Sequence, residues 1–168
     1  PSEARRRPVP QRCRWAERRT VSWSMATTAS AHRMDVFRRG STLIIDDSYN
    51  ANPDSMRAGI AALGQLGSGR KAAILGDMLE LGAASREEHL ALLPALEAAG
   101  VSLLIAVGPQ MAALAEAARD AGITARAVGA WEEAEAELSD MLNEDGALLI
   151  KGSHGSGVWH IATRLKGE

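Results

Sequence analysis

The polar side chains best suited to chemistry follow four apolar segments of the chain, each at the point where its segment ends. The apolar segments are rich in branched residues, which favours strands buried on both faces of a sheet. Ligands in open α/β sheets bind at the carboxyl ends of such strands. The candidate positions are, in chain order, Asp46, Asp47, Ser48, Tyr49, Asn50 and Asn52, then residues 76–82, 108–110 and 151–157.

Residues 41–56 contain the first apolar segment and the polar residues after it. Their pattern predicts a strand, a loop that begins with two acidic residues, and the start of a helix. Asn52 is suited to capping that helix, and Pro53 suits its first position. A strand, a polar loop and a helix N-terminus together form ligand sites in many α/β proteins. On residue types alone, an ordinary turn whose Asp and Asn side chains only satisfy backbone groups is the favoured interpretation.

The loop after the last apolar segment, residues 151–157, combines a lysine with three glycines between a predicted strand and a predicted helix. Backbone N–H groups of such a loop can surround an anion, with Lys151 adding positive charge. A short connection also needs glycine for its conformation and for close packing, so the pattern by itself leaves both interpretations open. His154, taken alone, is equally typical of a surface histidine.

Composition limits the class of protein. The 168 residues suit one domain with a real core, 46% are hydrophobic, and only 4% are aromatic, so the core must be mainly aliphatic. The net charge of −2 hides an asymmetry: residues 1–40 hold ten of the 19 bases and three of the 21 acids. The remaining acidic body argues against nucleic-acid binding by the fold.

Several other kinds of site are excluded by pattern. No apolar run approaches the roughly 20 residues of a membrane span. No Cys, His or acidic cluster has metal-ligand spacing. Residues 64–71 superficially resemble a phosphate-binding P-loop, but Arg70 occupies the lysine position and the segment precedes a strand instead of following one. A single cysteine, Cys13, fits a reducing compartment, and we expect the cytoplasm.

The order of the predicted elements indicates the fold class. We expect strands at residues 33–37, 42–47, 72–76, 103–107, 126–128 and 147–150, and helices at 53–66, 85–99, 110–121, 131–142 and 157–166. Ser85 and Glu88 form a candidate capping box, and Pro94, inside the helix that this box opens, should kink or break it. The pattern predicts an α/β protein with a doubly wound, mostly parallel, Rossmann-like sheet, an antiparallel entry hairpin and helices on both faces. Residues 1–32 are expected to be a basic, irregular tail or linker remnant, and residues 33–168 the domain.

Three blocks carry a resemblance to a known family. They are DDSYNANPDSM at residues 46–56, GDMLELG at 76–82 with His89 downstream, and KGS at 151–153. In this order they resemble the Mur ligases, in the form carried by the branch of the family that adds D-alanyl-D-alanine. The resemblance covers about residues 33–165 and is to the C-terminal domain of a three-domain enzyme.

The resemblance implies an ATP-dependent amide ligase of peptidoglycan-precursor synthesis, which joins D-Ala-D-Ala to UDP-MurNAc-tripeptide through an acyl phosphate. It implies that the catalytic centre, the P-loop and the Mg²⁺ ligands belong to a central domain and the UDP site to an N-terminal domain, so this chain alone should be inactive. Carried over, the residues near the nucleotide are Asp47, Tyr49, Asn50 and Asn52, and those near the dipeptide are Asp77, Lys151, Ser153 and His154.

Two departures from the family pattern lie near the end of the chain. His154 stands where the family usually has Arg, and Val158-Trp159 replaces a Met-Glu pair. The alternative function is a receiver-like or nucleotide-binding module without ligase activity, because paired acids after the first central strand and a lysine after the last are also found in receivers. A receiver needs a phosphorylatable Asp after the strand at 103–107, and residues 108–110 offer none.

Overall fold

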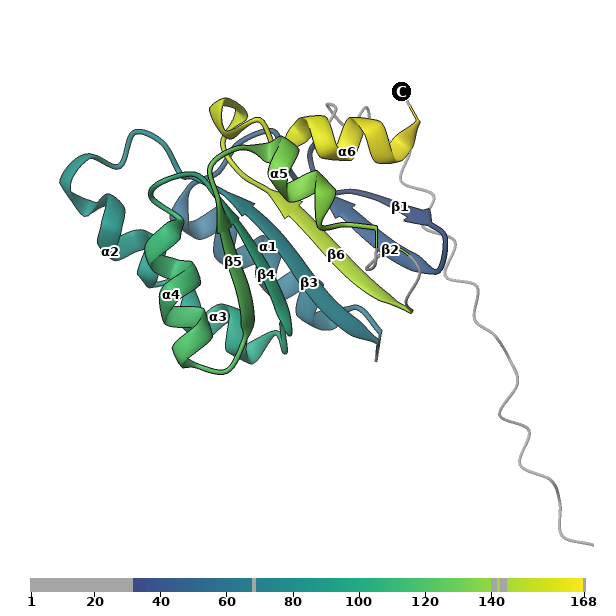
Figure 1. Ribbon diagram of the computed structural model, residues 1–168, viewed down its shortest axis with the longest axis horizontal. Coiled ribbons are helices and arrows are strands. Elements are labelled where there is room, and N and C mark those ends of the chain that lie inside the picture. The colour runs from purple at the N-terminus through teal and green to yellow at the C-terminus, as the bar shows by residue number, and fades with distance from the viewer. Residues whose placement is uncertain (1–31, 68, 140–141, 143–144, 168) are drawn as a thin grey trace, which may run out of the picture.

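A six-stranded sheet in the order β1-β2-β6-β3-β4-β5 forms the centre of the computed structural model, which describes residues 32–67, 69–139, 142 and 145–167 (Figure 1). The first two strands form an antiparallel hairpin, and all other neighbours are parallel. The predicted fold class is therefore confirmed. The strands are β1 Asp35–Arg39, β2 Thr42–Asp46, β3 Arg70–Gly76, β4 Leu103–Val107, β5 Thr124–Val128 and β6 Gly146–Lys151.

Helices cover both faces of the sheet. Three of them, α1 (Pro53–Gln65), α3 (Leu93–Ala98) and α4 (Ala112–Asp120), share one hydrophobic layer with the sheet, and α2 (Ser85–Leu90) packs beside α4. The other face is covered by α5 (Trp131–Ala136) and α6 (Trp159–Lys166), which Figure 1 shows in front of the strands. Two short 3₁₀ turns, Gly82–Ala84 and His154–Ser156, precede α2 and α6.

Successive residues of each central strand alternate between the two layers, as the period of two requires. In β2, Ile45 faces the α1 layer and Ile44 the α6 layer; in β6, Leu149 and Leu148 divide in the same way. The fully buried hydrophobic residues of both layers are aliphatic or Met, as the low aromatic content predicts. Burial on both faces explains why these strands are continuously apolar.

The start of α2 differs from the prediction. The residue before the helix is Ala84, which makes no side-chain cap, because a 3₁₀ turn leads directly into α2. The Ser85 hydroxyl instead donates to the side chain of Gln110. The predicted capping box with Glu88 is therefore wrong. The predicted break is present, since α2 ends at Leu90 and Pro94 lies in the first turn of α3, where its missing N–H costs nothing.

The helix predicted over residues 131–142 is shorter than expected, because α5 ends at Ala136. Leu138 is still buried, and Leu142 packs against the same layer, so the apolar stripe is used without a continuous helix. Met141 lies outside the described residues. So does the predicted tail up to residue 31, which stays a prediction. Within the described ranges, no helix has the length and hydrophobicity needed to cross a membrane.

A buried carboxylate fastens the C-terminal helix to the entry hairpin. Asp46, fully buried at the end of β2, accepts hydrogen bonds from Lys166 Nζ at 2.8 Å, His32 Nδ1 at 2.7 Å and Ser48 Oγ at 2.5 Å. Burial by itself would raise the pKa of Asp46, but these hydrogen bonds and the charge of Lys166 outweigh it and lower the pKa. Burial opposes the charge on Lys166 too, but Asp35 and Asp46 raise its pKa.

We predict that Lys166→Met lowers the free energy of unfolding by roughly 2–3 kcal/mol at pH 7, because it leaves Asp46 buried without its cation. Since the pKa of Asp46 is lowered on folding, its stabilisation is present above the ordinary value of 3.8 and is lost as pH falls through the lowered value. Since the pKa of Lys166 is raised, its contribution is present below 10.5 and is lost only as pH rises above that value. Urea unfolding should therefore show the difference between the two proteins shrinking as the pH is lowered from neutral to about 3.

Arg126→Met is the matched control, because Arg126 pairs with Glu137 at the surface, where its side chain is 61% exposed. Its cost should stay below about 1 kcal/mol. Equal losses for the two variants, or a Lys166→Met loss that does not depend on acid pH, would contradict the assigned network.

Candidate functional site

Three loops meet at the carboxyl edge of the sheet because β6 lies between β2 and β3. The loops that follow these strands enclose a hollow of about 680 Å³, within the range typical of small-molecule sites. Five of the eight predicted site residues line it: Tyr49, Asn50, Asn52, Ser153 and His154. The other lining residues are Ala51, Leu79, Glu80, Leu81 and Gly155.

Lys151 lies behind the hollow and is almost completely buried, with 1% of its surface exposed. Its ammonium group donates to Asp47 Oδ2 at 2.5 Å and to the backbone carbonyls of Asn50 at 3.0 Å and Asp47 at 3.3 Å. All three protons of the ammonium group can thus be satisfied within the chain. Helix α1 comes close to this lysine at Gly59, where an added Cβ would lie 3.0 Å from Lys151 Cδ. Lys151 therefore fixes the β2–α1 loop.

The carboxylate of Asp77 also forms its hydrogen bonds with backbone groups of the protein. Its carboxylate accepts hydrogen bonds from the N–H groups of Met111 at 2.8 Å and Gln110 at 3.3 Å, at the entrance of α4. The carbonyl of Asp77 accepts from Ser153, both from its N–H at 3.2 Å and from its hydroxyl at 2.7 Å. Gly108, at φ +106°, allows this approach, because an added Cβ would lie 2.5 Å from the Asp77 carboxylate. Asp77 and Ser153 thus join three loops.

His89 is fully buried, so it is not the solvated or capping group that its place on a helix suggests. Its Nδ1 donates to the Ser85 carbonyl at 2.6 Å, and its Nε2 accepts from the Met78 N–H at 3.0 Å. Because a carbonyl can only accept and an N–H can only donate, these two partners fix the neutral tautomer with its proton on Nδ1. His89 therefore holds the β3–α2 loop against α2.

Each of the two asparagines of the β2–α1 loop forms a hydrogen bond through its side-chain oxygen. Asn52 Oδ1 caps α1 by accepting from Ser55 N–H at 2.8 Å, and Asn50 Oδ1 accepts from Ala51 N–H. Their amide nitrogens, which donate, have no partner in the described part of the chain. Tyr49 is 46% exposed, and the Arg33 guanidinium lies 4.1 Å from its ring centroid. The loop therefore offers donors and an aromatic face to a ligand.

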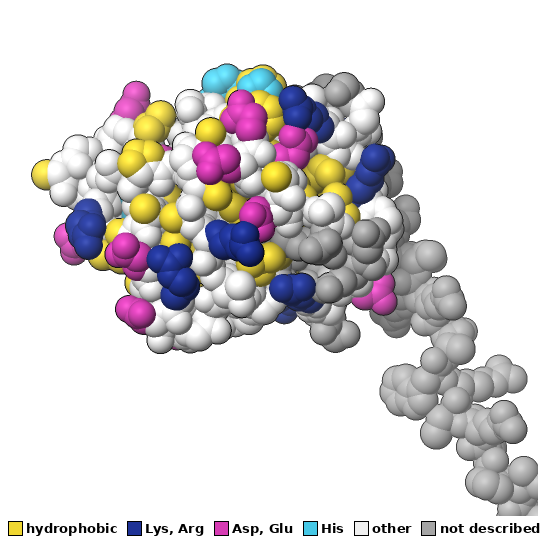
Figure 2. Space-filling model, viewed as in Figure 1, with side chains coloured by type: hydrophobic (Ala, Val, Ile, Leu, Met, Phe, Trp, Pro, Cys, Tyr) yellow, Lys and Arg dark blue, Asp and Glu magenta, His cyan; other side chains and the backbone are white. Residues whose placement is uncertain are grey.

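His154, at the rim of the hollow, begins a row of stacked rings. It lies parallel to Trp159 at 5.2 Å, and His160 continues the row from Trp159 to Trp131. Figure 2 shows histidine and hydrophobic side chains gathered at the edge of the molecule near α5 and α6. The row ties the rim of the hollow to both helices of that face.

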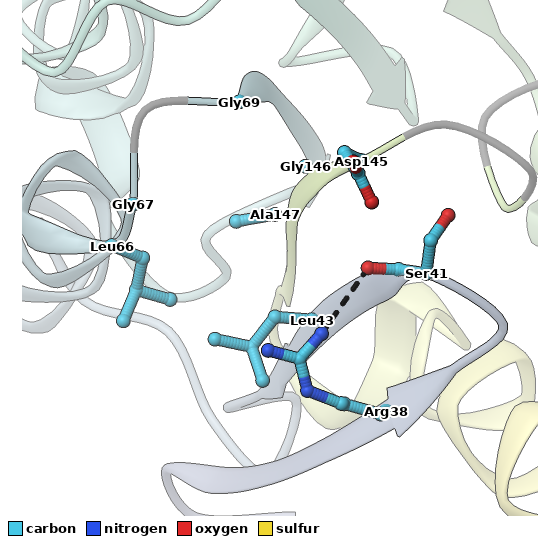
Figure 3. Close-up of a pocket in the computed structure, with 9 residues that line it drawn as sticks. All are labelled: Arg38, Ser41, Leu43, Leu66, Gly67, Gly69, Asp145, Gly146 and Ala147. Atoms are coloured by element: carbon cyan, nitrogen blue, oxygen red, sulfur yellow. Dashed lines mark hydrogen bonds between the residues drawn. The ribbon is translucent and has the colours of Figure 1, made fainter. Parts of the chain in front are cut away.

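A second hollow of about 340 Å³ lies at the opposite, amino edge of the strands (Figure 3). Arg38 lines it and donates to the Ser41 carbonyl, and Asp145 lies on its other side. Backbones approach closely here, since an added Cβ on Gly146 would lie 2.3 Å from the Arg70 carbonyl oxygen. Ligands of parallel sheets bind at the carboxyl edge, so the larger hollow is the better candidate.

Comparison with known proteins agrees with the geometry. A family described as "Mur ligase, glutamate ligase domain" matches residues 32–154. The chain belongs to the Mur ligase family.

Relatives of this Mur ligase domain are named UDP-N-acetylmuramoyl-tripeptide–D-alanyl-D-alanine ligase. The Mycobacterium tuberculosis protein is 34% identical over 171 residues, which cover 89% of this chain and 34% of that protein. The Escherichia coli protein is 41% identical over 75 residues, covering 45% of this chain and 16% of that protein. The chain thus spans about a third of the length of the first of these relatives.

Solved structures show the same fold. MurF from Acinetobacter baumannii superposes with a TM-score of 0.73 at 30% identity, covering 83% of this chain and 31% of that one. A domain of a putative Mur-type ligase from Haemophilus ducreyi has a TM-score of 0.56 at 18% identity and is covered over 96% of its length. The second likeness shows the fold alone.

Within this Mur ligase domain, the two departures from the family motifs contact each other. His154 and Trp159 stand where the resemblance leads us to expect Arg and Glu, and their rings stack with an interplanar angle of 5°. An aromatic contact therefore joins these two positions.

The sequence did not single out two charged groups near the hollow: Glu80 was one member of the candidate range 76–82, and Arg33 was not a candidate. Glu80 lies within the second family block, yet nothing in its type distinguished it from Asp77. Arg33 lies at the start of the domain, 16 residues before the tyrosine on which it stacks, and no sequence pattern links the two. Both positions depend on how the loops are assembled.

We predict that His89→Leu destabilises the domain by about 1–3 kcal/mol, because it leaves the buried Met78 N–H without an acceptor. Hydrogen exchange at the Met78 amide should accelerate, since the β3–α2 loop loses its attachment to α2. The control is Glu87→Ala, an exposed position on the same helix, which should change stability by less than about 0.5 kcal/mol. Unchanged Met78 exchange in a folded His89→Leu domain would refute the attachment.

Proposed function

We propose that this chain is the C-terminal domain of an ATP-dependent ligase that joins D-Ala-D-Ala to UDP-MurNAc-tripeptide. The observation that carries the proposal is the composition of the larger hollow, which is built from the loops that contain the three family blocks. The names of relatives at 34% and 41% identity support the same substrate pair. The domain would hold the incoming dipeptide and part of the nucleotide.

The hollow divides between these two ligands. The nucleotide side comprises Tyr49, Asn50 and Asn52, whose exposed ring and free amide donors suit a nucleotide, together with Asp47, which supports their loop through its pair with Lys151. The dipeptide side comprises Asp77, Lys151, Ser153 and His154. Within it, His154 is exposed at the hollow, whereas Asp77 and Lys151 are buried and act by holding the loops in place.

The chemistry assigned to this chain is binding and orientation. In the proposed reaction the tripeptide carboxylate is activated as an acyl phosphate, which the amine of the dipeptide then attacks. Among the described residues, no three His, Cys or acidic side chains are grouped so as to hold a metal ion. As the family resemblance implies, we propose that Mg²⁺ and most of the ATP site lie in a central domain and the UDP group in an N-terminal one.

The proposed partners are the two substrates and the central and N-terminal domains of the same enzyme, with no nucleic acid and no membrane, in the cytoplasm. The chain has no P-loop, so we expect no ligase activity from it alone. The alternative, a receiver-like module, would be phosphorylated by acetyl phosphate with Mg²⁺, whereas we expect this chain to remain unmodified.

A hybrid enzyme tests the proposal. Residues 33–168 would replace the corresponding domain of the Mycobacterium tuberculosis relative, and ADP formation would be measured with and without D-Ala-D-Ala. We expect turnover that depends on the dipeptide. A folded hybrid that hydrolyses no ATP in response to the dipeptide, beside an active parent enzyme, would contradict the proposed function.

In this hybrid, Lys151→Met should raise the KM for ATP by about tenfold and the KM for D-Ala-D-Ala by less, because Lys151 fixes the β2–α1 loop, which carries the nucleotide side of the hollow. Methionine preserves most of the side-chain length but leaves Asp47 unpaired, so a stability loss of roughly 3 kcal/mol should accompany the change. Equal increases in the two KM values would show that Lys151 supports the whole hollow and not its nucleotide side.

A further inference from the structure

Glu80 provides the free negative charge in the hollow. Of the carboxylates in the surrounding loops, Asp47 is bound by Lys151 Nζ and Met34 N–H, and Asp77 caps the entrance of α4. Glu80 is exposed, lines the hollow, and has no hydrogen-bond or ion-pair partner within the described part of the chain. Its two oxygens are therefore available to a ligand.

The backbone conformation at Glu80 is energetically unfavourable for a residue other than glycine. Its φ is +64°, in the left-handed region that glycine adopts freely and that other residues adopt only rarely. The preceding part of the loop is fixed by Asp77 and by the buried His89, which leaves Glu80 little freedom to relax. A strained residue that makes no stabilising contact of its own is typical of a functional position.

Charge in the rest of the hollow favours a cationic group beside Glu80. Lys151, the basic residue closest in sequence to Ser153 and His154, is neutralised by Asp47 and is shielded from the hollow. The other lining groups include the amides of Asn50 and Asn52 and the imidazole of His154, and Arg33 brings a positive charge over the ring of Tyr49. A ligand with an ammonium group at one end and acceptors at the other would satisfy both Glu80 and these groups.

We infer that Glu80 binds the ammonium group of the incoming amine substrate and so determines that this ligand must carry a free amino terminus. The inference rests on the proposed function and adds to it the residue that recognises the amine. Glu80 acts here by binding and orientation, and His154, on the dipeptide side of the hollow, is left for the carboxylate end of the same ligand.

The test is an amide NMR titration of the 168-residue chain with D-Ala-D-Ala and with N-acetyl-D-Ala-D-Ala, which lacks the ammonium group. The expected result is a set of shifts at Glu80, Leu81, His154 and Gly155 with the free dipeptide, and a dissociation constant at least about tenfold weaker for the acetylated one. Glu80→Gln should weaken binding of the free dipeptide by a similar factor. Glu87→Gln, an exposed change outside the hollow, should not.

Glu80→Gly separates recognition from folding. Since glycine accepts the positive φ, the unfolding midpoint of this variant should stay the same or rise, while dipeptide binding is lost. A lower midpoint with binding retained would assign Glu80 a structural part and overturn the inference.

The remaining outcomes distinguish the two levels of the account. Binding in the hollow that is unaffected by Glu80→Gln, or equally strong for the acetylated dipeptide, would overturn the inference and leave the proposed function standing. The absence of any shift in the hollow would overturn both the inference and the assignment of the dipeptide to this domain.

Discussion

The ion pair between Lys151 and Asp47 is the interaction on which the candidate site depends. A buried ammonium group is tolerated only when its charge is paired and its protons are hydrogen-bonded, and here one carboxylate and two carbonyls do this. The partners come from the end of the last strand and the loop after the second, 104 positions apart. Pairing them fixes the β2–α1 loop beside β6, and with it the wall that carries Tyr49 and Asn50.

The other two loops are held by equally specific contacts. Asp77 and Ser153 join the loops after β3 and β6, and His89 attaches the β3 loop to α2. These polar groups are satisfied by one another, so the loops present a few free groups on a rigid frame, chiefly the ring of Tyr49, the imidazole of His154 and the carboxylate of Glu80. A domain of this kind can bind and orient substrates for chemistry carried out elsewhere in a larger enzyme.

The fold was largely predictable because each central strand is a continuous apolar segment and, after the entry hairpin, each connection between strands contains a helix. The order of the sheet brought the predicted residues to one edge, and the family blocks marked the correct loops. What sequence could not show was which charges remain free. Lys151 and Asp77 were expected at the ligand, but pairings across 104 and 34 residues turn them to the protein itself. Glu80 and Arg33 became recognisable only once the loops were assembled, and His154 and Trp159 became a matched pair only through their stacking.

A crystal structure of the 168-residue chain with D-Ala-D-Ala and a non-hydrolysable ATP analogue would test the central claim most directly. The account predicts density for the dipeptide in the hollow between Glu80 and His154, with the nucleotide against Tyr49 and the Lys151–Asp47 pair intact. Density for either ligand in the hollow beside Arg38 and Asp145, or a Lys151 released from Asp47 to bind the dipeptide directly, would contradict it.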